Sequence, residues 1–173
     1  MDTMFFGAVA LTQAVLPLMR EQDGGAIVQI SSMGGQVTAP GFGAYCAAKF
    51  APEGLSESLA AEVEPFGIRV LIVEPGGFRT GFGWDGMRRS RDSGVYGATV
   101  GATRKAVDAM DGSQPGDPDK AAAAILDALD AEAPPLRLAL GADAVEGIGA
   151  ALDRRRADLD AWAAVARGTA VTD

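Results

Sequence analysis

Short apolar runs rich in β-branched residues recur along the chain, separated by longer segments with helical spacing. The clearest runs are residues 26–31 (AIVQIS), 68–74 (IRVLIVE) and 136–140 (LRLAL). Gly or Pro residues flank each run, and each has the length of a strand buried on both faces. The pattern therefore predicts three buried β-strands.

Five segments between and around these runs have the spacing or the end signals of helices. They span about residues 5–21, 45–65, 99–110, 119–132 and 143–166. Asp117 followed by Pro118 is a good N-cap and first-turn pair for the fourth helix. Pro134 and Pro135 are expected to end it.

The alternation of helices and strands predicts parallel strands, right-handed crossovers and helices on both faces of the sheet. We expect residues 1–173 to form a single α/β domain, a partial Rossmann-like doubly wound parallel sheet of about three strands. Because three strands are few for such a sheet, the first strand should have an unpaired edge. The polar, Gly-rich segment 77–98 is expected to be a loop that covers a binding site.

The opening segment, residues 5–19, is apolar enough to resemble a signal peptide or a membrane span. It has no basic segment in front of it, it contains Gln13, and it is shorter than the ~20 residues that a span needs. We therefore expect a buried helix and no membrane partner.

The composition excludes several kinds of function. A net charge of −8 argues against a nucleic-acid partner. The basic clusters at Arg88, Arg89 and Arg91 and at residues 154–156 have acidic neighbours, and we expect them to be solvated. There is no histidine, which removes Ser-His and Cys-His catalysis and His-based metal sites, and no metal is expected. The single Cys46 forms no internal disulfide, which fits a cytoplasmic protein.

Four polar residues fall where the ends of the first strand and the second helix are expected to meet. Ser31 and Ser32 end the first strand, Tyr45 follows Ser32 by thirteen residues, and Lys49 lies four residues after Tyr45. Residues i and i+4 share one face of a helix, so the Lys49 ammonium is expected near the Tyr45 phenol. The carboxyl edge of a parallel sheet is also where ligands bind in such folds.

This arrangement predicts proton transfer. A free tyrosine titrates near ~10, and a neighbouring cation lowers that pKa. Tyr45 is then able to exchange a proton with an alcohol or carbonyl oxygen while a nicotinamide exchanges the hydride. The Ser32 hydroxyl is expected to hold the same oxygen.

The segments IVQISSMGG, YCAAK and VEPGGFRT, in this order and spacing, resemble the short-chain dehydrogenase/reductase family from its fifth helix to its C-terminus. The resemblance implies that Ser32, Tyr45 and Lys49 are catalytic. It also implies binding of NADP or NAD, with Lys49 on the nicotinamide ribose. The residues that the resemblance implies in cofactor binding are Ser31, Tyr45, Lys49, Pro75, Gly76, Phe78 and Thr80. A small carbonyl or alcohol substrate and a homo-oligomer are further expectations from the resemblance.

The sequence departs from the family pattern in several places. The family's opening strand, Gly-rich phosphate turn and Asn-Asn-Ala-Gly segment are not found, so we expect the chain to correspond to the catalytic C-terminal half. Gly77, Gly81 and Gly83 have the spacing of the missing turn, but no apolar helix follows them. Met4 stands where the family often has a catalytic Asn. Pro52 interrupts the expected second helix, and a kink there would change the direction of the Lys49 side chain.

The leading hypothesis is an NAD(P)-dependent oxidoreductase that interconverts a carbonyl and an alcohol with Tyr45 as acid and base. The alternative is an inactive remnant that folds or oligomerises without binding a dinucleotide. A serine hydrolase is disfavoured because the chain has neither a histidine nor a G-x-S-x-G turn.

Overall fold

A computed structural model describes residues 1–82, 89–110 and 112–171. The strands are β1 (Gly25–Ile30), β2 (Ile68–Pro75) and β3 (Arg137–Leu140). The helices are α1 (Gly7–Glu21), α2 (Gly43–Val63), α3 (Ala102–Met110), α4 (Pro118–Asp130) and α5 (Ala142–Arg167). Short helical segments precede α1 and α3, at Asp2–Phe6 and Gly97–Gly101, and others lie at Met33–Gly35 and Glu64–Phe66.

The three strands form one parallel sheet in the order β1-β2-β3, which confirms the predicted fold class. Gly25 to Ile30 pair with Ile68 to Val73, and β3 pairs with the last half of β2, from Ile72 onward. Within the described residues the outer edge of β1 is unpaired, as the sequence predicted. The predicted element boundaries agree with the observed ones to within three residues.

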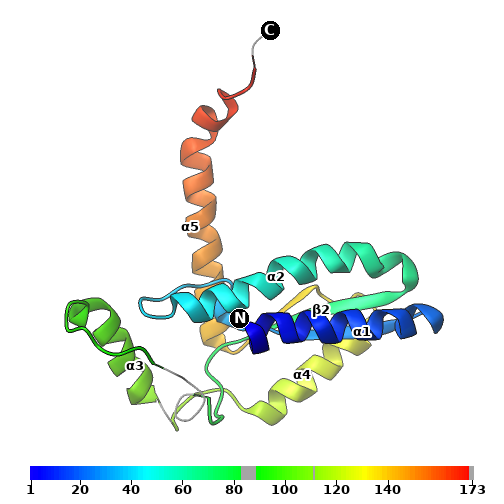
Figure 1. Cartoon of the computed structure of the whole chain (residues 1–173), viewed down its shortest axis with the longest axis horizontal. Coiled ribbons are helices and arrows are strands. Elements are labelled where there is room, and N and C mark those ends of the chain that lie inside the picture. Colours follow the sequence, from blue (N-terminus) through cyan, green and yellow to red (C-terminus); the bar gives the residue numbers. More distant parts are fainter. Residues whose placement is uncertain (83–88, 111, 172–173) are drawn as a thin grey trace.

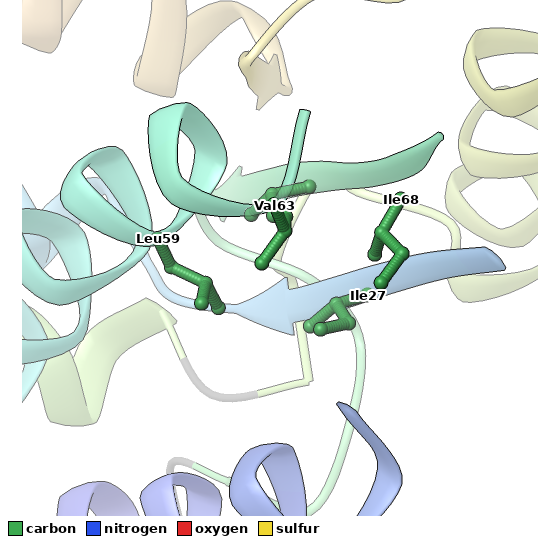
Figure 2. Packing of buried hydrophobic residues seen from close by; sticks show 5 residues of the cluster. Ile27, Leu59, Val63 and Ile68 are labelled. Atoms are coloured by element: carbon green, nitrogen blue, oxygen red, sulfur yellow. The ribbon is translucent and has the colours of Figure 1, made fainter. Parts of the chain in front are cut away.

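Helices cover both faces of the sheet. On one face Leu59 and Val63 of α2 pack on Ile27 of β1 and Ile68 of β2, as Figure 2 shows. On the other face the apolar side of α4 packs on Leu71 and a cluster around it. Burying a side chain of this size contributes about 1.5–3 kcal/mol, so these two layers account for much of the stability of the sheet.

The expectation of a buried first helix is wrong for this structure. Only 6% of the apolar helix Asp2–Glu21 is buried, and by length and composition alone this helix is able to cross a membrane. It touches the sheet along one side, where Gln29 donates a 3.0 Å hydrogen bond to Thr12, while Leu11 and Leu18 are exposed. Apolar residues occupy more of the surface of α1 than the one side that contacts β1.

The last helix, α5, begins against the sheet and then extends away from it (Figure 1). Ala144, Ile148 and Ala151 are buried, whereas the side chains from Leu152 onward are mostly exposed. The start of α5 therefore belongs to the core, and this part of the helix comes close to the end of β2.

Candidate functional site

The carboxyl end of β1 forms the base of the site. The Ser31 amide donates a 2.8 Å hydrogen bond to the carbonyl of Val73, which continues the sheet by one residue. Ser32 caps the short helix Met33–Gly35, and its Oγ accepts a 3.0 Å hydrogen bond from the Gly34 amide. Both serine side chains are buried, so local backbone structure holds them in place.

Tyr45 lies in the first turn of α2, with its ring against Gly34. A Cβ atom at Gly34 would lie 2.8 Å from Cε1 of Tyr45 and 3.4 Å from Oγ of Ser32. The absence of a side chain at Gly34 therefore lets the phenol approach the serine. Burial raises the pKa of Tyr45, the hydrogen bond with Ser32 lowers it, and the nearby Cys46 raises it further.

Lys49 lies one turn after Tyr45, and its Nζ donates a 2.9 Å hydrogen bond to the carbonyl of Ile30. Burial lowers the pKa of Lys49, and the charge of Glu53 opposes this. The net lowering of the Tyr45 pKa that the sequence predicted is not seen, because the shift of the phenol is upward and burial is its main cause. The structure brings the side chains of Ser32, Tyr45 and Lys49 together, and burial is the main cause of the pKa shifts of Tyr45 and Lys49.

A buried acidic cluster lies behind this site. Glu53 and Glu74 are 4% and 2% exposed, and Arg137 of β3 contacts both, at 3.1 Å and 3.6 Å. Gln36 donates to both carboxylates as well. Burial and the charge of Glu53 raise the pKa of Glu74. Sequence reasoning missed this cluster, because its hydrogen-bonded pairs are separated by 17 to 84 residues in the sequence.

The turn that follows β2 is held by contacts within the chain. Pro75 is the last residue of β2, and the amide of Gly76 donates to the carbonyl of Leu140 at 2.9 Å. The amide of Gly77 donates to the Asp143 carboxylate at 2.7 Å. A Cβ at Gly76 would collide with that carboxylate, so the close approach of α5 requires glycine there.

Phe78 and Thr80 point in different directions. The half-buried Phe78 ring packs against the cluster that contains Leu71 and Leu140. Thr80 is exposed, and its Oγ1 accepts a 3.4 Å hydrogen bond from the amide of Phe82. Part of the expected covering loop, residues 83–88, and with it Gly83 and Arg88, lies outside the described residues.

Aromatic rings and a cavity adjoin Tyr45. The rings of Phe42 and Phe82 lie 6.0 Å and 5.6 Å from the Tyr45 ring. A cavity of about 120 Å³ on this side of Tyr45 is lined by residues of the 40–45 segment, by Arg89 and Ser90, and by Arg104 and Val107 of α3. Sequence reasoning did not single out Phe42, Phe82 or Arg104, because exposed aromatic and basic residues have no distinguishing pattern.

The departures from the family pattern have structural outcomes. Met4 lies in the segment Asp2–Phe6, which packs against α2. The helix α2 continues through Pro52 without a break, and Lys49 still reaches the end of β1. The interruption that Pro52 was expected to cause is therefore accommodated within one helix.

Comparison with known proteins identifies the chain's relatives. The sequence model of the short chain dehydrogenase family matches residues 1–90. The chain is 42% identical over 161 residues to the oxidoreductase BOA17 of Botryotinia fuckeliana, covering 93% of this chain and 59% of that protein.

Two solved structures share the fold. A short-chain dehydrogenase from Streptomyces avermitilis superposes with a TM-score of 0.85 at 54% identity, covering 95% of this chain and 60% of that one. A short chain dehydrogenase from Burkholderia cenocepacia, solved in complex with NADP, has a TM-score of 0.61 at 26% identity, covering 92% of this chain and 55% of that one. The chain thus spans less than two thirds of the length of these relatives. With half of its length matched by the family and its fold shared with these enzymes, the chain belongs to the short-chain dehydrogenase family.

Proposed function

We propose that this protein is an NAD(P)-dependent oxidoreductase that interconverts a carbonyl and an alcohol, with Tyr45 as the acid and base. The observation that carries the proposal is that Tyr45, Ser32 and Lys49 lie together at the carboxyl end of a parallel strand, where the Tyr45 ring and the Ser32 hydroxyl both adjoin Gly34 and Lys49 reaches Ile30. Two hydroxyl groups at one point are able to hold a single substrate oxygen from two sides.

The residues around Lys49 are compatible with a nicotinamide dinucleotide. The Lys49 ammonium has three donors, and among the described residues it uses one, on Ile30. The others suit the hydroxyls of a ribose. The Oγ of Ser31 is buried and has no hydrogen-bond partner among the described residues. A bound dinucleotide supplies the hydride in reduction and accepts it in oxidation.

The turn after β2 fits the cofactor less fully. The amides of Gly76 and Gly77 already donate to Leu140 and Asp143. Thr80 keeps its hydroxyl at the surface, whereas the phenyl group of Phe78 is packed in the core. We therefore propose that this stretch contributes the Thr80 hydroxyl rather than the glycine amides.

The raised pKa of Tyr45 fits the acid role. Because a phenol whose pKa is raised above 10.0 is protonated at neutral pH, Tyr45 is able to donate its proton to the carbonyl oxygen during reduction. The phenolate that remains would lie one turn from the Lys49 ammonium, whose charge favours it. In the oxidising direction the phenolate takes the proton back from the alcohol.

The test is a pair of tyrosine variants. NADPH or NADH oxidation is measured with a panel of aldehydes and ketones, for the wild type, Tyr45→Phe and Tyr96→Phe. Tyr96 is the exposed second tyrosine and serves as the matched control. We expect Tyr45→Phe to abolish turnover and Tyr96→Phe to retain it. Wild-type activity in Tyr45→Phe would refute the assigned role.

A second candidate function is a chain that folds without binding a dinucleotide. Among the described residues, the unpaired edge of β1 favours it. Calorimetric titration with NADPH and with NADH separates the two: saturable binding supports the oxidoreductase, and no binding of either supports the second candidate.

We further propose a cytoplasmic homo-oligomer; the exposed Leu11 and Leu18 of α1 support the oligomer, because they leave an apolar surface for a second copy.

A further inference from the structure

The cavity beside Tyr45 has a cationic wall that the proton chemistry at Tyr45 does not use. Arg104 of α3 and Arg89 both line it, together with Tyr45 itself. The whole chain carries a net charge of −8, so two guanidinium groups at one cavity are not part of a general basic surface. Phe42 and Val107 supply apolar wall between them and the tyrosine.

We propose that this cavity binds the carboxylate of the substrate through Arg104, so that the protein acts on carbonyl compounds that carry a carboxylate. The proposal deepens the proposed function, on which it rests for the reaction at Tyr45. The binding site itself is defined by residues that the proton transfer does not need.

The hydrogen bonds of Arg104 leave donors for a ligand. Its Nη2 donates to the carbonyl and the hydroxyl of Ser90, at 3.1 Å and 2.9 Å. Among the described residues no carboxylate pairs with Arg104, and no partner engages its Nε or Nη1. A guanidinium has five donors in a planar fork, which suits a carboxylate in two-point contact. Ser90 therefore orients the group and leaves donors for such a contact.

Arg89 has a different role, because it is already neutralised. Its Nη2 lies 2.5 Å from the Asp108 carboxylate. This pair joins the segment before residue 92 to α3, and so does the bond from Arg104 to Ser90. In the part of the chain that the structure describes, one unpaired positive charge remains at the cavity, which matches a monoanionic carboxylate better than a doubly charged phosphate.

The cavity has the size and the lining for a short molecule. Its volume of about 120 Å³ holds a few carbon atoms, and it contains Tyr45 as well as Arg104. The 40–42 segment packs closely on the helical segment that leads into α3, since a Cβ at Gly41 would lie 2.9 Å from Val100. Figure 1 shows that α3 lies on the same side of the molecule as the start of α2. We place the carbonyl of the substrate near Tyr45 and its carboxylate at Arg104, with a short apolar linker between them.

The test uses a keto acid and its ester on the isolated chain, without a dinucleotide. 4-Oxopentanoate and methyl 4-oxopentanoate are titrated by NMR, following the amides of residues 40–45 and 104–107. We expect saturable binding of the acid and binding of the ester about tenfold weaker, because the ester lacks the charge that the guanidinium recognises. Equal affinities, or no saturable binding of the acid, would overturn the proposal.

Variants separate the site from general charge effects. Arg104→Gln is expected to weaken binding of the acid about tenfold and to leave the ester unchanged, while Arg104→Lys gives an intermediate loss. Arg154→Gln, an exposed arginine on α5, removes the same charge elsewhere and should change nothing. Unchanged acid binding in an Arg104→Gln variant with a native circular dichroism spectrum contradicts the proposal.

A variant that is expected to strengthen binding of the acid guards against a folding artefact. Asp108→Asn releases Arg89 and is expected to strengthen binding of the acid about threefold, whereas Asp127→Asn on α4 is the matched control with no effect. Inorganic phosphate binding more tightly than the keto acid would also overturn the choice of a carboxylate. Because none of these measurements needs turnover, a failure here leaves the oxidoreductase proposal standing, and a failure of the Tyr45→Phe test leaves this site standing.

Discussion

The ammonium of Lys49 is hydrogen bonded to the carbonyl of Ile30 at 2.9 Å, which joins the second helix to the end of the first strand. The bond places a cation directly beside the two serines that follow Ile30, and burial has lowered its pKa. A lysine whose pKa is shifted by burial and that lies beside such hydroxyl groups is a functional candidate.

The pH dependence of stability tests this view of Lys49. Its pKa in the folded state is lowered from 10.5, so the unfolded chain holds the proton to higher pH. Between the two pKa values the unfolded state binds more protons, and stability rises with pH. We expect the free energy of unfolding of the wild type, relative to Lys49→Met, to increase as pH rises toward 10.5. Urea unfolding at several pH values measures it, and a constant difference would contradict the assignment.

Gly34 is expected to control the position of Tyr45. In Gly34→Ala the new methyl group would lie 2.8 Å from Cε1 of the ring, which must move away. A displaced ring loses part of its burial, so the pKa of Tyr45 should fall toward 10.0. Ultraviolet titration in a Tyr96→Phe background measures this. Gly43→Ala is the control, since nothing lies within 4 Å of its Cβ; identical titrations in the two variants would be evidence against the packing described.

Arg137 is expected to be essential for stability although it lies outside the site. Arg137→Met leaves the buried Glu53 and Glu74 without their shared cation. We expect the free energy of unfolding to fall by about 2 kcal/mol, less than for a fully buried pair, because the arginine is partly exposed. Arg156→Met breaks the exposed pair with Asp160 and should cost no more than about 0.5 kcal/mol. Urea unfolding compares the two, and equal losses would refute the role of the cluster.

Glu74 gives a pH effect of its own. Burial and Glu53 raise its folded pKa above 4.5. Its stabilising contribution is therefore complete below pH 4.5 and is lost as pH rises through the folded pKa. Glu74→Gln cannot ionise, so its stability relative to the wild type should increase from acidic to neutral pH. Thermal unfolding across this range checks it, and a pH-independent difference would show that the pKa of Glu74 is the same in the folded and unfolded states.

Much of the fold followed from local pattern. The apolar runs predicted β1, β2 and β3. Helical spacing, with end signals such as Asp117 and Pro118, predicted the helices, because periodicity and end signals are properties of neighbouring residues. The same holds for Tyr45 and Lys49, whose spacing of four places them on one helix face whatever the rest of the chain does. The burial of α1 was mispredicted, because an apolar segment does not reveal how much of its surface other elements cover.

The sequence by itself determined the family, the parallel sheet and the set of Ser32, Tyr45 and Lys49, since all of these depend on residue type and short spacing. Only the tertiary structure decided that burial raises the pKa of Tyr45, that Arg137 neutralises Glu53 and Glu74, and that Arg104 lies at the same cavity as Tyr45. These relationships join residues that are tens of positions apart. Desolvation and charge pairing depend on distance in space, for which the sequence carries no local signal.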